Sequence, residues 1–157
     1  MKSLLPEADP TFSKDYYKPL LDSLHAEVLL AEGSLEEAAA VGKKVSYLVD
    51  PKWDYIIASY NTCFSRDVLA RIYIQKGELD KAITEYERLM TFDPANKDWR
   101  LVHPKFHYRL GILYEQKGLK NKAIDQYEKF LDLWKEADLG IIEVEDARKR
   151  LADLQVP

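Results

Sequence analysis

The chain has 157 residues, and its 46% hydrophobic and 32% charged residues are typical of a folded domain rather than a disordered chain. The net charge of −4 argues against a nucleic-acid binder, which usually carries a basic excess. No apolar run approaches the roughly 20 residues that a membrane-spanning helix needs. Because Cys63 is the only cysteine and the first ten residues lack the apolar core of a signal peptide, we expect a cytoplasmic location.

Apolar residues recur with the period of an α-helix along most of the chain, and no stretch alternates in the manner of a β-strand. Glycines and longer linking segments divide this pattern into seven predicted helices. Their expected ranges are 14–32, 35–48, 65–76, 79–91, 104–117, 120–136 and 142–154. The sequence therefore predicts an all-α chain.

Three glycines in similar surroundings indicate an internal repeat. Gly33, Gly77 and Gly118 each end one predicted helix and directly precede another. Glycine is suited to this position because it adopts the left-handed conformation that ends a helix. We therefore expect three helix pairs, each with a glycine in its turn.

Small and aromatic residues recur at fixed offsets from these glycines. Ala82 and Ala123 follow their glycines by five residues, and an alanine there lets two helices approach closely. Tyr86 and Tyr127 come four residues later, on the same face of the helix. The first copy departs from the pattern, because Gly42 stands where the tyrosine is expected. Ahead of the second and third glycines the matching residues are Leu69, Ala70, Tyr73, Leu110, Gly111 and Tyr114.

These offsets resemble the tetratricopeptide repeat, although the glycines lie further apart than the family's usual period of about 34 residues. The resemblance implies a right-handed α-α superhelix of antiparallel helix pairs. We expect a single domain over residues 1–157, with repeats at about 16–51, 63–96 and 104–137. A capping helix at about 142–154 is expected to close the array, because Val144, Ala147, Leu151 and Leu154 form an apolar stripe.

The resemblance also implies a function, since arrays of this family bind a peptide or protein segment in a concave groove lined by the first helix of each pair. We therefore expect a scaffold or adaptor module, within a larger signalling or regulatory protein. The inserts 52–65 and 95–103 are expected to pack as ordered loops or helix extensions. The groove residues carried over from the family are Phe64, Asp67, Val68, Arg71, Gln75, Lys105, Tyr108, Arg109 and Ile112.

Two of these residues match part of a carboxylate-binding subset of the family. Lys105 and Arg109 occupy its basic positions in the third repeat, whereas Glu27 would repel a carboxylate. We therefore reject the complete carboxylate site. The hypothesis that remains is a basic patch of Arg71, Lys105 and Arg109 that binds an acidic segment of a partner.

Self-association is the alternative function. The first predicted helix carries an apolar face with no earlier repeat to cover it, and exposed apolar surface of this kind favours a homodimer. The residues of this face are Leu20, Leu21, Leu24 and Val28.

Catalysis and metal binding are not expected, and neither is a cofactor. His103 and His107 have the spacing of metal ligands, but Pro104 places His103 at or before the helix start, and no third ligand has a suitable position. No catalytic signature surrounds Cys63. The acidic residues Glu36, Glu37, Glu143, Glu145 and Asp146 lie near helix starts, where negative charge stabilises the helix dipole. An enzyme, the remote alternative, would need titratable groups converging in a pocket.

Overall fold

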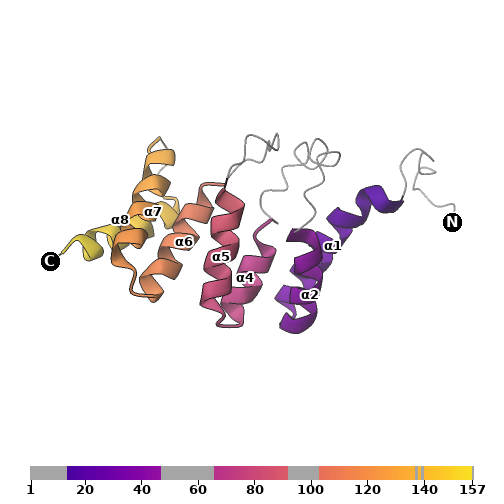
Figure 1. Ribbon diagram of the computed structural model, residues 1–157. Helices are drawn as coiled ribbons and strands as arrows, with labels where there is room; N and C mark the ends of the chain where they lie inside the picture. Colours follow the sequence, from indigo (N-terminus) through magenta and orange to yellow (C-terminus); the bar gives the residue numbers. More distant parts are fainter. Residues whose placement is uncertain (1–13, 47–65, 92–102, 137, 139, 157) are drawn as a thin grey trace.

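The computed structural model describes residues 14–46, 66–91, 103–136, 138 and 140–156 (Figure 1). Within these ranges the chain forms helices and turns, with no residue in a strand. The predicted inserts, with Cys63 and Phe64, lie almost entirely outside the described residues. The helices are α1 (Lys14–Ala31), α2 (Leu35–Ser46), α4 (Val68–Gln75), α5 (Leu79–Met90), α6 (Lys105–Gln116), α7 (Lys120–Leu133) and α8 (Ile142–Gln155).

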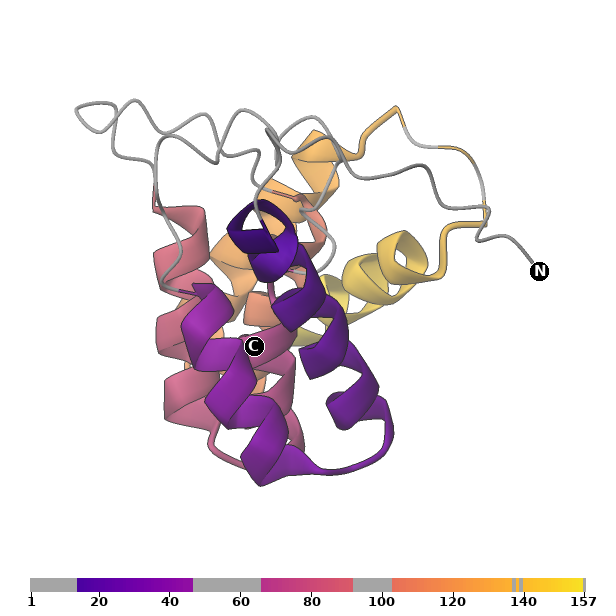
Figure 2. The same ribbon diagram turned by 90° about the vertical axis from the view of Figure 1, so that its right-hand side faces the viewer.

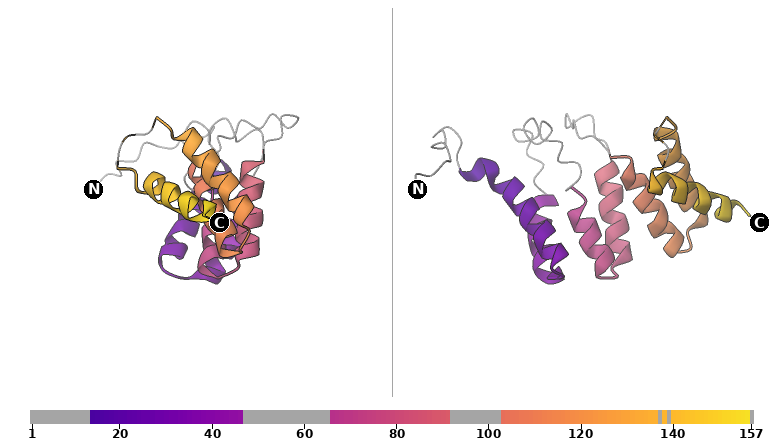
Figure 3. Two further views of the ribbon diagram at one scale, coloured as in Figure 1. Left: turned by 90° about the vertical axis from the view of Figure 1, so that its left-hand side faces the viewer. Right: turned by 180° about the vertical axis from the view of Figure 1, so that it is seen from behind.

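The helices form antiparallel pairs that stack side by side: α1 with α2, α4 with α5, and α6 with α7. The second helix of each pair packs on the first helix of the next, α2 on α4 and α5 on α6. Figure 2 looks onto α1 and α2 from one end of the array, and Figure 3 shows α8 at the other end. The predicted all-α repeat solenoid is therefore confirmed.

A glycine in the left-handed conformation closes the turn within each pair. The φ angles of Gly33, Gly77 and Gly118 are 79°, 73° and 70°. In the first turn the amide of Ser34 donates to the carbonyl oxygen of Leu29 at 2.9 Å, which ends α1 in a Schellman motif. Equivalent hydrogen bonds follow the other two glycines, so the predicted role of these residues is confirmed.

Small residues allow the two helices of a pair to lie close together. Ala82 and Ala123 are both completely buried, as the repeat pattern predicted. Gly111 of α6 lies directly against the ring of Tyr127 in α7, since a Cβ atom there would be 2.6 Å from Cε1 of that ring. The glycine is therefore required by the closeness of the two helices.

The weak first repeat has a structural reason at Gly42 in α2. A Cβ atom on this glycine would lie 3.4 Å from both Leu69 and Ile72 of α4. α4 therefore packs directly over the backbone of α2.

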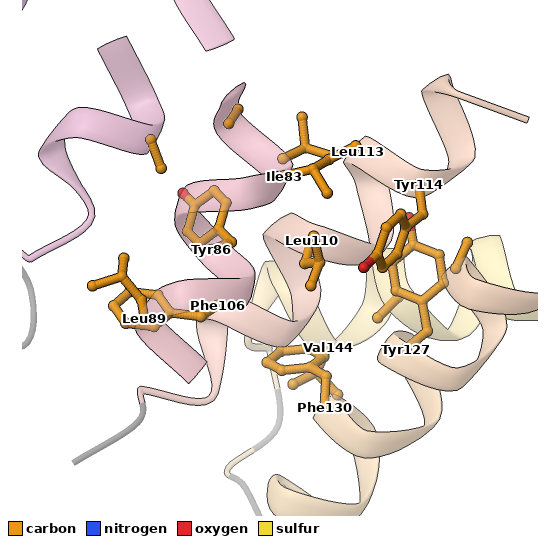
Figure 4. Packing of buried hydrophobic residues seen from close by; sticks show 14 residues of the cluster. Ile83, Tyr86, Leu89, Phe106, Leu110, Leu113, Tyr114, Tyr127, Phe130 and Val144 are labelled. Atoms are coloured by element: carbon orange, nitrogen blue, oxygen red, sulfur yellow. The ribbon is translucent and has the colours of Figure 1, made fainter. Parts of the chain in front are cut away.

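Two apolar cores lie along the array. The larger core is formed by α4 to α8 and contains the fully buried rings of Tyr86, Tyr127 and Phe130 (Figure 4). Tyr86 of α5 also packs on Phe106 of α6, with ring centroids 5.7 Å apart. The smaller core joins α1 and α2 to α4 and consists of Ala26, Leu29, Leu30, Ala38, Ala39, Val68 and Ile72.

The last helix, α8, packs on α7 and α6 through the predicted apolar stripe. Val144 and Ala147 are buried, and Leu151 and Leu154 are partly buried against the larger core. Residues on its outer side, such as Lys149, are exposed. This amphipathic helix therefore covers the apolar surface of the third pair, as the sequence predicted.

Candidate partner-binding face

Ion pairs connect the first helices of successive pairs in one continuous line. Arg71 of α4 pairs with Glu27 of α1, and its Nε atom also donates to Oδ1 of Asp67 at 3.0 Å. Arg109 of α6 pairs with the other carboxylate oxygen of Asp67. These contacts join α1, α4 and α6 across both boundaries between pairs.

The line continues from α6 to α8. Nζ of Lys105 lies 2.6 Å from Oε1 of Glu143, and the hydroxyl of Tyr108 donates to Asp146 at 2.8 Å. Further along, Arg150 of α8 pairs with Glu115 of α6 at 3.1 Å. α8 thus takes the place that the first helix of another pair would have. We call the whole set the polar ladder: Glu27, Asp67, Arg71, Lys105, Tyr108, Arg109, Glu115, Glu143, Asp146 and Arg150.

Asp67 is the centre of the polar ladder. It is completely buried, and it accepts a hydrogen bond of 2.8 Å from the hydroxyl of Tyr86 in addition to its contacts with Arg71 and Arg109. A buried carboxylate is costly unless it is paired and hydrogen-bonded, and here both conditions are met. Burial, followed by the charge of Asp67, raises the pKa of Tyr86, so this hydroxyl stays protonated and remains a donor.

The surroundings of two arginines in the polar ladder favour their charged forms. Burial lowers the pKa of Arg71, but the hydrogen bond to Glu27 and the charge of Asp67 outweigh this effect and raise it. Burial also opposes the charged form of Arg109, and the charge of Asp67 again outweighs it. At the other end, the hydrogen bond from Lys105 lowers the pKa of Glu143. The contacts of the ladder therefore favour the charged forms of Arg71, Arg109 and Glu143.

The predicted groove residues differ in burial: some are at the surface and others are in the interior. Arg71, Lys105, Tyr108 and Arg109 are partly exposed members of the polar ladder, Gln75 is exposed, and Ile112 is partly buried against the larger core. Asp67 and Val68 are buried, at 0% and 1% exposure, because the first turn of α4 packs into the interior. These two residues support the surface from beneath and do not line it.

The predicted basic patch is balanced by acidic residues. Arg71, Lys105 and Arg109 have the acidic partners Glu27, Glu143 and Asp67, respectively, among the contacts above. The sequence predicts that Glu27 would repel an incoming carboxylate, but it does not reveal that Glu27 is the partner of Arg71. The repeat register was the available signal, because it places both residues on first helices of neighbouring pairs.

His103 and His107 have neighbours typical of helix packing. Nδ1 of His107 lies 2.8 Å from Oε1 of Gln126 on α7. Burial lowers the pKa of His103, as do the charges of Lys105 and Arg109. Within the described ranges no three His, Cys, Asp or Glu residues come together as a metal site.

Stacked antiparallel helix pairs with glycine turns define the chain as an α-α helical repeat protein. A family model described as TPR repeat matches residues 70–118, and one described as tetratricopeptide repeat matches residues 104–133. Residues 70–133 of the chain are therefore similar to tetratricopeptide repeats. A search of curated proteins found no match. Among the helices that the structure describes, none has the length and apolar character to cross a membrane.

Proposed function

We propose that this chain is a non-catalytic scaffold or adaptor of the cytoplasm that binds a peptide or protein segment along the first helices of its repeats. Tetratricopeptide repeats are generally protein–protein interaction modules. The observation that carries the proposal is the polar ladder, which presents partly exposed charged and aromatic side chains from several first helices on one connected surface.

The ion pairs of the polar ladder favour a ligand whose carboxylates can replace the ladder's own exposed carboxylates. The side chains of Glu27 and Glu143 are 30% and 31% exposed, whereas Asp67 is completely buried. An acidic segment of a partner would therefore compete with Glu27 and Glu143, while Asp67 keeps Arg109 in place. Each such exchange replaces one carboxylate by another on the same cation, so it costs less than opening a new charged site.

Lys105 and Glu143 provide a test with two opposite expected results. Peptides would first be selected from a displayed library against the whole chain, and their affinity would then be measured by fluorescence anisotropy. The Lys105→Gln substitution should lower the affinity for an acidic peptide by about threefold to tenfold, which is the usual effect of removing one partly exposed charge pair. The Glu143→Gln substitution removes the partner of Lys105 and should therefore raise the affinity for the same peptide.

The matched control is Lys129→Gln on α7. Lys129 is also paired with a carboxylate, Asp125 at 2.8 Å, but it lies on the second helix of its pair. Its replacement should leave the affinity unchanged. Equal losses for Lys105→Gln and Lys129→Gln, or no response to either Lys105→Gln or Glu143→Gln, would contradict binding at this part of the ladder.

A further inference from the structure

α1 lies at one end of the array (Figure 2), and one side of this helix carries a stripe of exposed apolar residues. Leu21, Leu24 and Val28 are 61%, 53% and 53% exposed, on the side of the helix opposite the buried Ala26 and Leu30. Their spacing of three and four residues places them in one line along the helix. Exposed apolar side chains gathered in one line mark a candidate contact surface. We call these three residues the α1 stripe.

Two of these three positions are buried wherever the other pairs are described, whereas Leu24 corresponds to the buried Val68 of α4 and to the partly exposed Arg109 of α6. Counted from the turn glycine, Val28 corresponds to Ile72 of α4 and Leu113 of α6, which are 0% and 1% exposed. Leu21 corresponds to Phe106, which is 3% exposed. Ile72 packs on α2 and Phe106 packs on α5, in each case the second helix of the preceding pair. The α1 stripe is thus a helix-packing surface that no described helix covers.

A polar edge beside the α1 stripe distinguishes it from an ordinary boundary between repeats. Lys18 and His25 of α1 and Glu32, the first residue after the helix, are all exposed and follow one another at intervals of seven residues. In α4 and α6 the position of His25 is taken by the buried residues Leu69 and Leu110. Another helix pair packed on α1 would have to bury His25 where its neighbours bury leucine. The stripe therefore suits a narrower contact that leaves this edge in water.

We propose that α1 packs on α1 of a second copy of this chain, with the two helices antiparallel and related by a two-fold axis near His25. An antiparallel helix pair brings the polar edges of both copies together, so Lys18 of each copy lies beside Glu32 of the other. The charges match in this orientation, whereas a parallel two-fold pair would place the two polar edges on opposite sides of the contact. Glu27, at the other border of the stripe, already has Arg71 as its counter-ion.

The size of the α1 stripe sets the expected affinity. Three apolar side chains per copy form an interface well below the usual size of a stable dimer, so we expect a dissociation constant of about 10 to 100 µM. This self-association is separate from the proposed binding of a partner along the polar ladder. It uses the outer side of α1 and leaves Lys105 and Glu143 untouched.

The first test is sedimentation equilibrium of the whole chain from low micromolar to near-millimolar concentration. The average mass should rise from that of one chain towards that of two. In the Leu21→Arg/Val28→Arg variant the dissociation constant should rise by at least about tenfold. The matched control is Leu133→Arg/Ile142→Arg, at residues that are 57% and 77% exposed near the other end of the array, and this variant should dimerise like the original chain.

The second test uses the polar edge. Lys18→Glu and Glu32→Lys should each weaken self-association by about threefold to tenfold, since each places like charges together twice. An equimolar mixture of these two variants should form a mixed dimer as strong as the original, because every opposed pair is again oppositely charged. The Lys18→Glu/Glu32→Lys double variant should dimerise normally for the same reason.

Three results would overturn the proposal. A chain that stays monomeric at every concentration leaves the α1 stripe to a different protein. A Leu21→Arg/Val28→Arg variant that still dimerises places the contact on another face. If the mixed variants and the double variant do not regain the original dimerisation affinity, the antiparallel arrangement is ruled out.

Discussion

At the scale of single residues, Asp67 is the side chain on which most of the polar ladder depends. Its carboxylate is fully buried and contacts Arg71, Tyr86 and Arg109, which come from three different helices. Removing one partner of a buried charge pair is costly, because the remaining charges are left without compensation in a medium of low polarity. The substitution Asp67→Asn keeps the shape of the side chain and removes only its charge.

We expect Asp67→Asn to lower the free energy of unfolding by about 3 kcal/mol, because two guanidinium groups lose their shared counter-ion. Urea denaturation followed by circular dichroism measures this. Asp132→Asn is the control, since Asp132 is 76% exposed and lies 3.6 Å from its partner Lys135. Its effect should stay below about 0.5 kcal/mol. Similar values for the two variants would show that the buried contacts contribute no net stability.

At the scale of helices, the glycines at two packing positions differ in the room around them. A Cβ atom at Gly111 would lie 2.6 Å and 2.8 Å from ring atoms of Tyr127. That ring cannot move aside easily, because it is buried and its hydroxyl donates to Glu115 at 2.8 Å. A Cβ atom at Gly42 would instead make ordinary contacts of 3.4 Å with Leu69 and Ile72.

Alanine at these two positions should therefore have opposite effects on stability. Gly111→Ala should destabilise the chain by about 1 to 3 kcal/mol, since overpacking outweighs the gain in helix propensity. Gly42→Ala should stabilise it by up to about 1 kcal/mol, because propensity improves without a clash. Thermal unfolding of both variants provides the comparison. If Gly111→Ala were as stable as Gly42→Ala, the close approach of α6 and α7 would not be required for folding.

At the scale of the whole molecule, four tyrosine hydroxyls donate to carboxylates in different parts of the array. The pairs are Tyr86 with Asp67, Tyr108 with Asp146, Tyr114 with Glu87 and Tyr127 with Glu115. In all four tyrosines burial is the main cause of a raised pKa, and the adjacent carboxylate raises it further. For Tyr108 the pKa rises from 10 to about 12.

This pattern predicts how stability depends on alkaline pH. A raised pKa in the folded state means that the neutral tyrosine is favoured by folding. Its contribution is complete below the usual pKa of about 10 and is lost as the pH rises through the folded pKa. We therefore expect stability to fall from about pH 10 upward, with the window for Tyr108 between 10 and about 12.

Tyrosinate absorbance and circular dichroism, recorded in one alkaline titration, would test this expectation. The ionisation of these four tyrosines should coincide with loss of helix, while the urea-unfolded chain should titrate near the usual pKa. If all ten tyrosines ionised near that value with the helices intact, the carboxylate contacts would not hold the protons.

The sequence was sufficient to predict the fold because its signals are local. Helical periodicity and the turn residues Gly33, Gly77 and Gly118 act within a few residues, and the helices and left-handed turns occur where they were expected. The position of Gly42 marked the first repeat as atypical. Its cause, α4 packing directly over α2, involves residues far along the chain and could not be read from the local pattern.

The candidate site was predicted only in part, because its contacts cross the boundaries between repeats. The repeat register placed Arg71, Lys105 and Arg109 on first helices, but periodicity does not show which acidic residue each one meets. Glu143 was interpreted as an acidic residue at a helix start, and it is also the partner of Lys105. Burial of Asp67 likewise depends on the docking of three helices.

The sharing of α4 between the two cores has a mechanical consequence. Val68 and Ile72 belong to the smaller core and Ala70 to the larger one, and no other described helix contributes buried residues to both. A load that pulls the two ends of the described array apart is therefore transmitted through the eight residues of Val68–Gln75. Rotation of α4 about its own axis would weaken its packing contacts with one core and compress its contacts with the other. The shortest of the described helices thus sets how stiffly the first pair is coupled to the rest.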